Sequence, residues 1–311
     1  MAQNSHLFGP IPSRRLGRSL GIDLTPCKTC SLNCIFCQLG SSPNTTLRRE
    51  EYVPLKAVLA EIDTWLSRDG HADVLTLSGC GEPTLHSRFG EVLAHIKASC
   101  SLPTALLTNG TLLERPDVRS AAALADTVKM TLSAWDEKSF VRIHRPHPEL
   151  HFDGLLAGER AFAAEYGGTL LLEVFLLPGV NDSWEAVRRI ARLAETLQPT
   201  RVQLNTAIRP PADRTIKPVP LHRLQELAQA FEPKAEIIAG SSASSSDSGA
   251  VGQEDLLSLL TRRPCTLEDI CRAFGESETT ISELVQSLLA SGRIRRVSDA
   301  YYQARDDEAE S

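Results

Sequence analysis

Four of the eight cysteines lie in one short stretch, at Cys27, Cys30, Cys34 and Cys37. The last three are spaced Cys-x3-Cys-x2-Cys, and the aromatic Phe36 stands directly before the third. Thiolates are soft donors that repel one another, so this density indicates a metal centre. Three cysteines can hold three corners of a four-iron cluster and leave the fourth iron open to a small molecule, which suits a catalytic cluster.

Two other interpretations of the four cysteines stay open at this point. Cys27 and Cys30 with Cys34 and Cys37 form paired Cys-x2-Cys units, the usual spelling of a structural zinc site. Zinc knuckles normally separate their pairs by a dozen or more residues, whereas only three residues intervene here. An electron-transfer cluster with Cys27 as the fourth ligand is the second alternative. We favour Cys27 as a spare thiol beside the site.

Polar residues follow several of the expected strands. The strand over 73–78 ends in Gly79-Cys80-Gly81-Glu82-Pro83, and the next strand ends in Thr108-Asn109-Gly110. The strand after that ends at Ser133. Because the carboxyl ends of parallel strands meet at one edge of a sheet or barrel, we expect these residues to lie near the cysteine loop.

The cysteine spacing with its aromatic, the Gly-Glu-Pro turn and the Thr-Asn-Gly turn together resemble the radical S-adenosylmethionine (SAM) superfamily. The resemblance implies that Cys30, Cys34 and Cys37 ligate a [4Fe–4S] cluster whose open iron takes the amino and carboxylate groups of SAM. One electron from an external donor, flavodoxin-like or ferredoxin-like, then splits SAM to a 5'-deoxyadenosyl radical. The residues implied to hold SAM are Gly81, Glu82, Asn109 and Ser133. Cys80 departs from the family pattern, because a glycine normally stands there.

The remaining pattern predicts the elements that position these residues. Strands are expected near 19–23, 73–78, 104–108, 128–133, 170–176 and 201–204. Helices are expected near 53–66, 90–98, 116–123, 150–164, 183–197 and 221–231. Such alternation indicates a parallel sheet, and about six units are too few for an eight-fold barrel. The expected fold is α/β, an open (β/α)6 barrel of the radical SAM type.

The chain divides into a core and a small appendage. Residues 1–238 are expected to form the barrel, and the Ser- and Gly-rich segment 239–252 a flexible linker. Residues 253–304 carry three amphipathic helical patterns and a hairpin pattern, which resemble a winged helix-turn-helix domain. Thr266 and Ser277 are the expected caps of its second and third helices. The acidic tail 305–311 is expected to be disordered.

Composition limits the partners. The chain has 42% hydrophobic and 23% charged residues and a net charge of −6, which gives no general attraction to nucleic acid or anionic membrane. From residue 252 onward seven arginines oppose twelve carboxylates, and the third helical pattern of that domain has no basic residue. We therefore expect no DNA binding and no membrane. Eight cysteines, half of them in one loop, suit metal binding in a reducing cytoplasm better than a disulfide framework.

Three further polar segments have two interpretations each. The arginines Arg14, Arg15 and Arg18 form either a solvated turn or contacts to an anionic substrate. The segment 142–148 is expected as a loop, either solvated or closing over an anionic ligand. Glu173 lies in an apolar strand and therefore needs a partner.

The predicted function is that of a radical SAM enzyme with an unidentified substrate, either a protein or peptide or a tRNA. The lead-in, the cysteine loop and the segment 203–211 also resemble poorly characterised proteins near the wyosine-base synthesising enzymes. An RNA-base modifying enzyme of that type is one alternative. A regulator that senses SAM or redox state through its cluster is another.

Overall fold

An open, curved sheet of eight strands carries the fold of this chain in the computed structural model, which describes residues 6–13, 15–42, 44–68, 71–238, 251–298 and 300–305. The strands lie side by side in sequence order, and all neighbouring pairs are parallel except the first. They are β1 (Leu7–Ser13), β2 (Gly17–Ile22), β3 (Val74–Leu77), β4 (Thr104–Leu107), β5 (Thr127–Thr131), β6 (Thr169–Leu176), β7 (Arg201–Thr206) and β8 (Glu236–Ile237).

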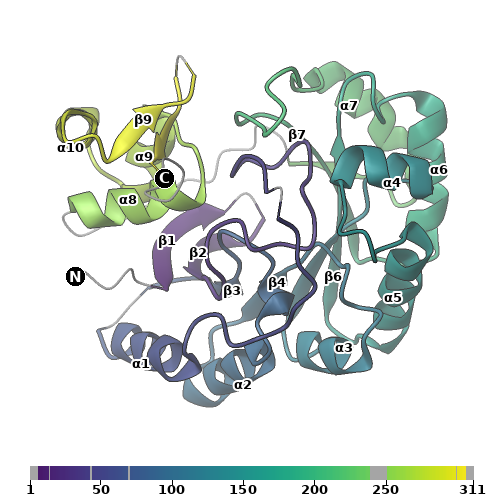
Figure 1. The fold of residues 1–311 in the computed structure, drawn as a ribbon, viewed down its shortest axis with the longest axis horizontal. Coiled ribbons are helices and arrows are strands. Elements are labelled where there is room, and N and C mark those ends of the chain that lie inside the picture. Colours follow the sequence, from purple (N-terminus) through teal and green to yellow (C-terminus); the bar gives the residue numbers. More distant parts are fainter. Residues whose placement is uncertain are drawn as a thin grey trace.

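Helices follow β2 to β7 and line the outside of the curved sheet (Figure 1). They are α1 (Leu55–Leu66), α2 (Phe89–Ser99), α3 (Pro116–Ala122), α4 (Glu137–His144), α5 (Phe152–Glu165), α6 (Trp184–Glu195) and α7 (Leu221–Leu227). This arrangement confirms the α/β class and the open radical SAM-type barrel predicted from the sequence.

The sheet is buried on both sides. All four residues of β3 are buried, and Ile22, Leu75 and Leu77 have no exposed surface. Apolar side chains of the helices fill the outer layer of the same core, such as Val58 and Ile62 of α1. Burial on both faces explains why these strands read as continuous apolar runs rather than as alternating patterns.

The sequence did not predict two features of the fold. The extended lead-in is a strand, β1, which pairs antiparallel with β2 and has an irregular register between Phe8 and Ile11. The segment expected as a loop over 142–148 begins inside a helix, because α4 continues to His144 and Arg145 then turns the chain with a left-handed backbone. The expected arginine turn is only partly described, because Arg14 lies outside the described residues.

The C-terminal part contains three helices and a two-stranded antiparallel hairpin. They are α8 (Gln253–Arg262), α9 (Leu267–Phe274), α10 (Glu278–Ala290), β9 (Ile294–Arg296) and β10 (Tyr302–Ala304). The side chains of Thr266 and Ser277 accept hydrogen bonds from Asp269 N–H and Thr280 N–H, so both predicted caps are present. Residues 239–250 and 306–311, expected as most of the linker and the tail, lie outside the described residues.

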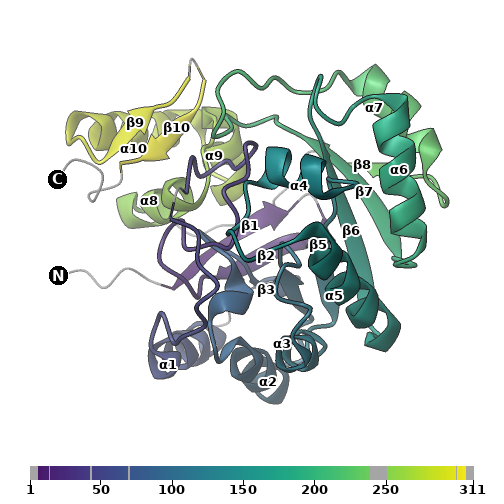
Figure 2. The same cartoon turned by 45° about the vertical axis from the view of Figure 1, so that its right-hand side comes forward.

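The C-terminal helices pack directly on the barrel. Phe8 and Ile11 of β1 belong to the apolar cluster of these helices and not to the main core. Figure 2 shows this unit against β1, at one edge of the sheet. Tyr301 donates a hydrogen bond to the Ile208 carbonyl at 2.8 Å, which attaches the hairpin end to the segment after β7. Among the described residues, no helix is long and apolar enough to span a membrane.

Candidate cluster and cofactor site

The cysteine loop follows β2 and is held by the end of α4. Asn33 N–H donates to the His144 carbonyl and Ile35 N–H donates to the Ile143 carbonyl, each at 3.0 Å. Phe36 stacks on Phe175 of β6 with ring centroids 4.2 Å apart. The loop is therefore fixed across the barrel mouth from two directions, through its backbone and through the aromatic of the cysteine motif.

The three motif thiols are free and face a common, water-poor environment. Burial raises the pKa of Cys30 to about 12, and burial also raises the pKa of Cys37. Burial and the charges of the Cys30 and Cys37 thiolates raise the pKa of Cys34 well above its usual range. Thiols that close together cannot ionise alone, whereas cationic iron replaces their protons and removes this repulsion.

This donor set fits an iron–sulfur cluster better than a single ion. Among the described residues, no three His, Cys, Asp or Glu side chains are grouped so that they could hold one metal ion. A four-iron cluster needs a different arrangement, with one thiolate for each of three irons. The spacing of Cys30, Cys34 and Cys37 on one loop supplies these three thiolates.

The Gly-Glu-Pro turn joins the cysteine loop to the end of β3. Glu82 N–H donates to the Thr29 carbonyl at 2.9 Å, and a Cβ at Gly81 would lie only 2.2 Å from the same oxygen. Only glycine permits this approach. The Glu82 carboxylate accepts hydrogen bonds from Thr108 Oγ1 at 2.6 Å and from Asn109 N–H at 2.8 Å, so it links the ends of β3 and β4.

Asn109 connects the same turn to a motif cysteine. Its side-chain Nδ2 donates to Ser31 Oγ at 3.0 Å and points to Cys30 Sγ at 3.5 Å. Its Oδ1 accepts hydrogen bonds from the backbone N–H and the hydroxyl of Thr111. Gly81, Glu82 and Asn109 are thus brought together around Cys30, as the resemblance implied.

Ser133 lies elsewhere. It is fully buried, and its Oγ accepts a hydrogen bond from Phe175 N–H at 2.8 Å. The Ser133 carbonyl accepts a second hydrogen bond from Asn181 Nδ2 at 2.9 Å. These contacts fix the end of β5 against β6, and Ser133 does not line the cavity described below.

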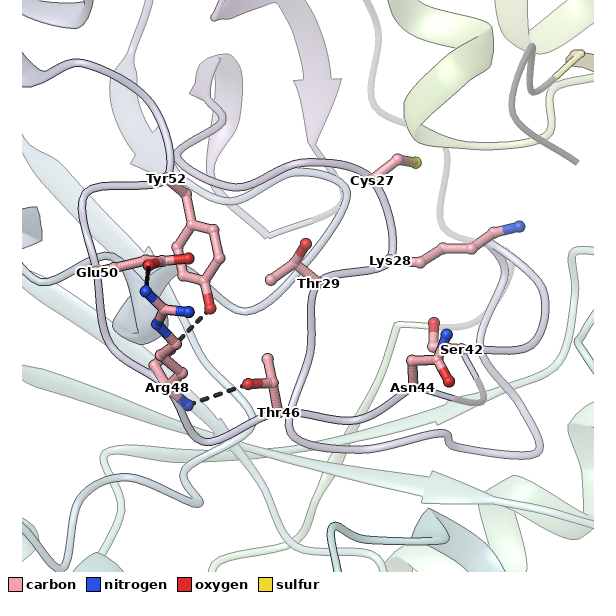
Figure 3. A pocket seen from close by; sticks show the side chains of 9 residues that line it. All are labelled: Cys27, Lys28, Thr29, Ser42, Asn44, Thr46, Arg48, Glu50 and Tyr52. Atoms are coloured by element: carbon pink, nitrogen blue, oxygen red, sulfur yellow. Dashed lines mark hydrogen bonds and ion pairs between the residues drawn. The ribbon is translucent and has the colours of Figure 1, made fainter.

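Cys27 and Cys80, the two cysteines of uncertain role, meet each other. Lys28 N–H donates to the Cys80 carbonyl at 2.7 Å, and contact with the Cys27 thiol followed by burial raises the pKa of Cys80. Cys80 is 3% exposed and its thiol donates to the Thr261 carbonyl in α8 at 3.7 Å. Cys27 is exposed on the rim of a shallow hollow of about 480 Å³, opposite Tyr52 and Glu50 (Figure 3).

His144 is a site residue that the sequence reasoning missed. Its Nδ1 lies 3.2 Å from Cys34 Sγ, and its Nε2 is buried without a hydrogen-bond partner among the described residues. Burial lowers the pKa of His144 to about 4, so the ring is neutral at ordinary pH. A proton on Nδ1 then donates to the sulfur, an arrangement that tunes cluster potentials. The sequence does not distinguish His144 from the half-buried His147, because only the position of His144 on α4 turns it toward Cys34.

Arg15 and Glu173, both singled out in the sequence, pair inside the barrel. The Arg15 guanidinium bonds to Glu173 and donates to Gln203 Oε1 at 3.0 Å, so Arg15 does not belong to a solvated turn. Lys129 Nζ lies 3.2 Å from the other Glu173 oxygen. Because Lys129 is buried and near the Arg15 cation, its pKa is lowered to about 7.

These groups line one cavity of about 750 Å³ at the carboxyl ends of the strands. Its wall beside the cysteine loop is formed by Phe36, Cys37 and Gly81. Its wall inside the barrel is formed by Lys129 and Glu173. Residues of α8 and α9, such as Arg262 and Asp269, close it from the C-terminal part. Ligand sites of such barrels lie at this end of the strands.

The chain is similar in sequence to known proteins over the cysteine loop and the strands that surround the cavity. Residues 24–193 match the family described as the Radical SAM superfamily. A protein named GTPase Obg from Brachyspira hyodysenteriae is 34% identical over 94% of this chain, which spans only 44% of that relative. The UPF0026 protein MJ1312 of Methanocaldococcus jannaschii is 30% identical, over 92% of this chain and 91% of its own length. A UPF0026 protein of Helicobacter pylori is 35% identical, over 89% and 92% respectively.

Two solved structures share the fold. A structure of TYW1 with a lysine-pyruvate adduct bound superposes with a TM-score of 0.53 at 17% identity, over 73% of this chain and 76% of that one. Streptococcus suis SuiB bound to its precursor peptide SuiA gives a TM-score of 0.52 at 18% identity, over 70% and 48% respectively. At these identities the likeness concerns the fold alone.

Proposed function

The chain belongs to the radical SAM superfamily and, within it, to the group of UPF0026 proteins, and we propose that it cleaves SAM reductively to act on a substrate through a 5'-deoxyadenosyl radical. One observation carries the proposal. Three free, half-buried thiols, Cys30, Cys34 and Cys37, lie on one loop, and Cys37 lines the cavity at the carboxyl ends of the strands. A [4Fe–4S] cluster held there supplies the electron that breaks the sulfonium bond of SAM.

We assign the other residues by their contacts. Gly81 and Glu82 offer the backbone and carboxylate oxygens of a fixed turn to the amino group of SAM, and Asn109 orients Cys30. Ser133 enters this proposal indirectly, because its hydroxyl bonds to Phe175 N–H and fixes the end of β5. Phe36 and Phe175, stacked on each other, form an apolar part of the cavity wall and help to exclude bulk water from the radical.

The experiment is anaerobic reconstitution with iron and sulfide, reduction with dithionite, and chromatography for 5'-deoxyadenosine. Cys34→Ala is expected to abolish the product, because it removes a cluster ligand. Cys100→Ala, at the end of α2, is the matched control and is expected to retain product formation. A stable four-iron cluster in wild type that leaves SAM intact under strong reductant would favour an electron carrier or sensor, with Cys27 as the fourth ligand to examine.

A second candidate, RNA-base modification of the wyosine type, is favoured by Lys129. The Lys129 side chain is 11% exposed and lines the cavity, and its amine has a pKa of about 7, so much of the amine is neutral and nucleophilic near neutral pH. We propose that under this candidate Lys129 forms an imine with the carbonyl of an α-keto acid, releasing water. Borohydride with pyruvate should then fix a covalent adduct on wild type and none on Lys129→Met. An unchanged nucleoside profile in a deletion strain would refute the candidate.

The C-terminal part is proposed to be a winged-helix-like unit that serves the enzyme and not a gene regulator. Its net charge of 7 − 12 = −5 over residues 252–311 opposes DNA binding. Gel shifts with genomic fragments at low salt are expected to show no complex. We further propose that the substrate is a peptide or protein and that the electron comes from an external flavodoxin-like or ferredoxin-like donor. The proposed location is the cytoplasm. The free state of all eight cysteines supports a reducing compartment.

A further inference from the structure

The cavity is positively charged although the chain is acidic. Five arginines and three carboxylates line it, a balance of 5 − 3 = +2 before the partly protonated Lys129 is counted, against −6 for the whole chain. The cationic side chains are Arg15, Arg209, Arg262, Arg263 and Arg272, together with Lys129. A recess with one sign of charge and low-dielectric walls concentrates ligands of the opposite sign.

Most of these cations already have partners. Arg15 and Lys129 share Glu173, and Arg262 donates to Asp23 Oδ2 at 3.0 Å. Arg272 bonds to Glu268, and its second ion pair, to Asp269, is 3.8 Å long. All three lining carboxylates are thus engaged by cations other than Arg209 and Arg263.

Arg209 and Arg263 are different. The Nε atoms of both are buried and have no hydrogen-bond partner in the described part of the chain. Arg209 has one long side-chain contact, from Nη1 to Gln38 Oε1 at 3.5 Å. Burial, followed by the charge of Arg263, lowers the pKa of Arg209, so the two guanidiniums are close enough to repel. Two like charges this close in a half-buried place repel each other, and the carboxylate of Asp269, which also pairs with Arg272, offsets this repulsion only in part.

The two arginines come from different parts of the chain. Arg209 follows β7 of the barrel, and Arg263 is the C-cap of α8. Gln38, the contact of Arg209, is the neighbour of the motif residue Cys37. The pair therefore lies where the C-terminal unit meets the barrel, on the same cavity as the cluster loop.

We propose that Arg209 and Arg263 together bind an oxyanion group of the substrate, a carboxylate or a phosphate, inside this cavity. A planar guanidinium presents donors that match either group, and an anion between the two would relieve their repulsion and satisfy both Nε donors. The C-terminal unit then forms part of the substrate site, since it supplies one of the two arginines. The identification of the anion as substrate rests on the proposed function, whereas the anion site does not.

The test uses the full chain without cluster, titrated separately with inorganic phosphate and with malonate. Binding is followed by calorimetry and by the rise of the unfolding temperature. Arg209→Gln and Arg263→Gln are each expected to weaken the preferred anion at least about tenfold, because each removes a charged hydrogen-bond donor. The matched controls are Arg201→Gln, at the other end of β7, and Arg295→Gln in the exposed hairpin, with changes within about twofold. Whichever probe binds wild type more tightly identifies the group.

Several results would overturn the inference. They are equal anion binding by wild type and both cavity variants, an equal loss in the control variants, or no binding of either probe to wild type. If a Gln variant does not fold, Arg263→Lys replaces it, which keeps the charge but not the planar fork and is expected to weaken binding to an intermediate degree. SAM binding to reconstituted protein gives the last check, because a tenfold loss there in both variants would assign the pair to the SAM carboxylate.

The two proposals fail differently. Absence of deoxyadenosine with retained anion binding would remove the proposed function and leave an anion site. Deoxyadenosine formation without anion binding would do the reverse.

Discussion

Replacing Lys129 with methionine should change how the stability of the protein depends on pH. The Lys129 amine lies on β5, is 11% exposed, and shares the Glu173 carboxylate with a permanently charged arginine. Burial and Arg15 lower its pKa from 10.5 to about 7. An isosteric apolar side chain keeps the packing of the stem but removes the titrating group.

The sign and the size follow from proton linkage. Below pH 7 both the folded and the unfolded chain hold the proton, so the folded state carries the full cost of a buried charge. Between pH 7 and 10.5 the unfolded chain still binds a proton that the folded chain has released, so stability rises with pH. At about 1.4 kcal/mol per pKa unit, the shift makes wild type gain roughly 2.5 kcal/mol over the variant between about pH 6 and about pH 9.

The assay is equilibrium urea unfolding of the cluster-free protein under anaerobic, reducing conditions, followed by tryptophan fluorescence. All three tryptophans, Trp65, Trp135 and Trp184, lie in the barrel, so the signal reports the unit that holds Lys129. Because the Lys129 and Cys34 charges interact, the comparison is repeated in a Cys34→Ala background, in which this coupling is removed. Lys217→Met controls for the loss of a lysine from the surface. Parallel pH profiles of wild type and Lys129→Met would refute a neutral amine in the cavity, and with it the imine chemistry proposed for RNA-base modification.

Three other perturbations test separate contacts. Glu159 is fully buried with both carboxylate oxygens unpaired among the described residues, and burial raises its pKa well above 4.5. The free energy of unfolding should therefore fall as the pH rises through and beyond 4.5. In urea titrations Glu159→Gln should flatten this fall, whereas the exposed control Glu165→Gln should not. His144→Phe removes the hydrogen-bond donor to Cys34 Sγ, and a hydrogen bond that favours the reduced cluster by about 1 kcal/mol corresponds to roughly 40 mV. The cluster potential, measured by redox titration with electron paramagnetic resonance, should become more negative by that amount. An unchanged potential would show that the proton lies on Nε2. Arg262→Gln leaves the Asp23 carboxylate buried without its guanidinium, which should lower the free energy of unfolding by about 3 kcal/mol and expose α8 to limited proteolysis. The control Arg293→Gln breaks a surface pair with Glu254 and should give the wild-type digestion pattern.

Local pattern predicted much of this molecule. The strands predicted over 73–78 and 104–108 are observed as β3 and β4, and the predicted caps Thr266 and Ser277 are present. Each of these features depends on residues close together in sequence. Spacing alone also gave the cysteine loop. The interpretations that failed depend on distant partners. Arg15 was open to a solvated interpretation because Glu173 lies 158 residues away. The hydrogen bond from Phe175 N–H to Ser133 Oγ also joins two distant strands and was not foreseen, and the assignment of Ser133 to SAM stays a prediction.

The C-terminal unit shows best why sequence reasoning stopped where it did. Its acidic charge predicts no DNA binding, but charge summed over a domain does not reveal which face is turned inward. Arg262 and Arg263 end α8 at the barrel, where one pairs with Asp23 and the other faces the cavity beside Arg209. A domain with a net charge of −5 thus contributes positive charge at the one place where it meets the site. If the substrate is an anion, this local excess of positive charge is the feature that selects it. Separating the C-terminal unit from the barrel should then weaken anion binding even when both parts remain folded.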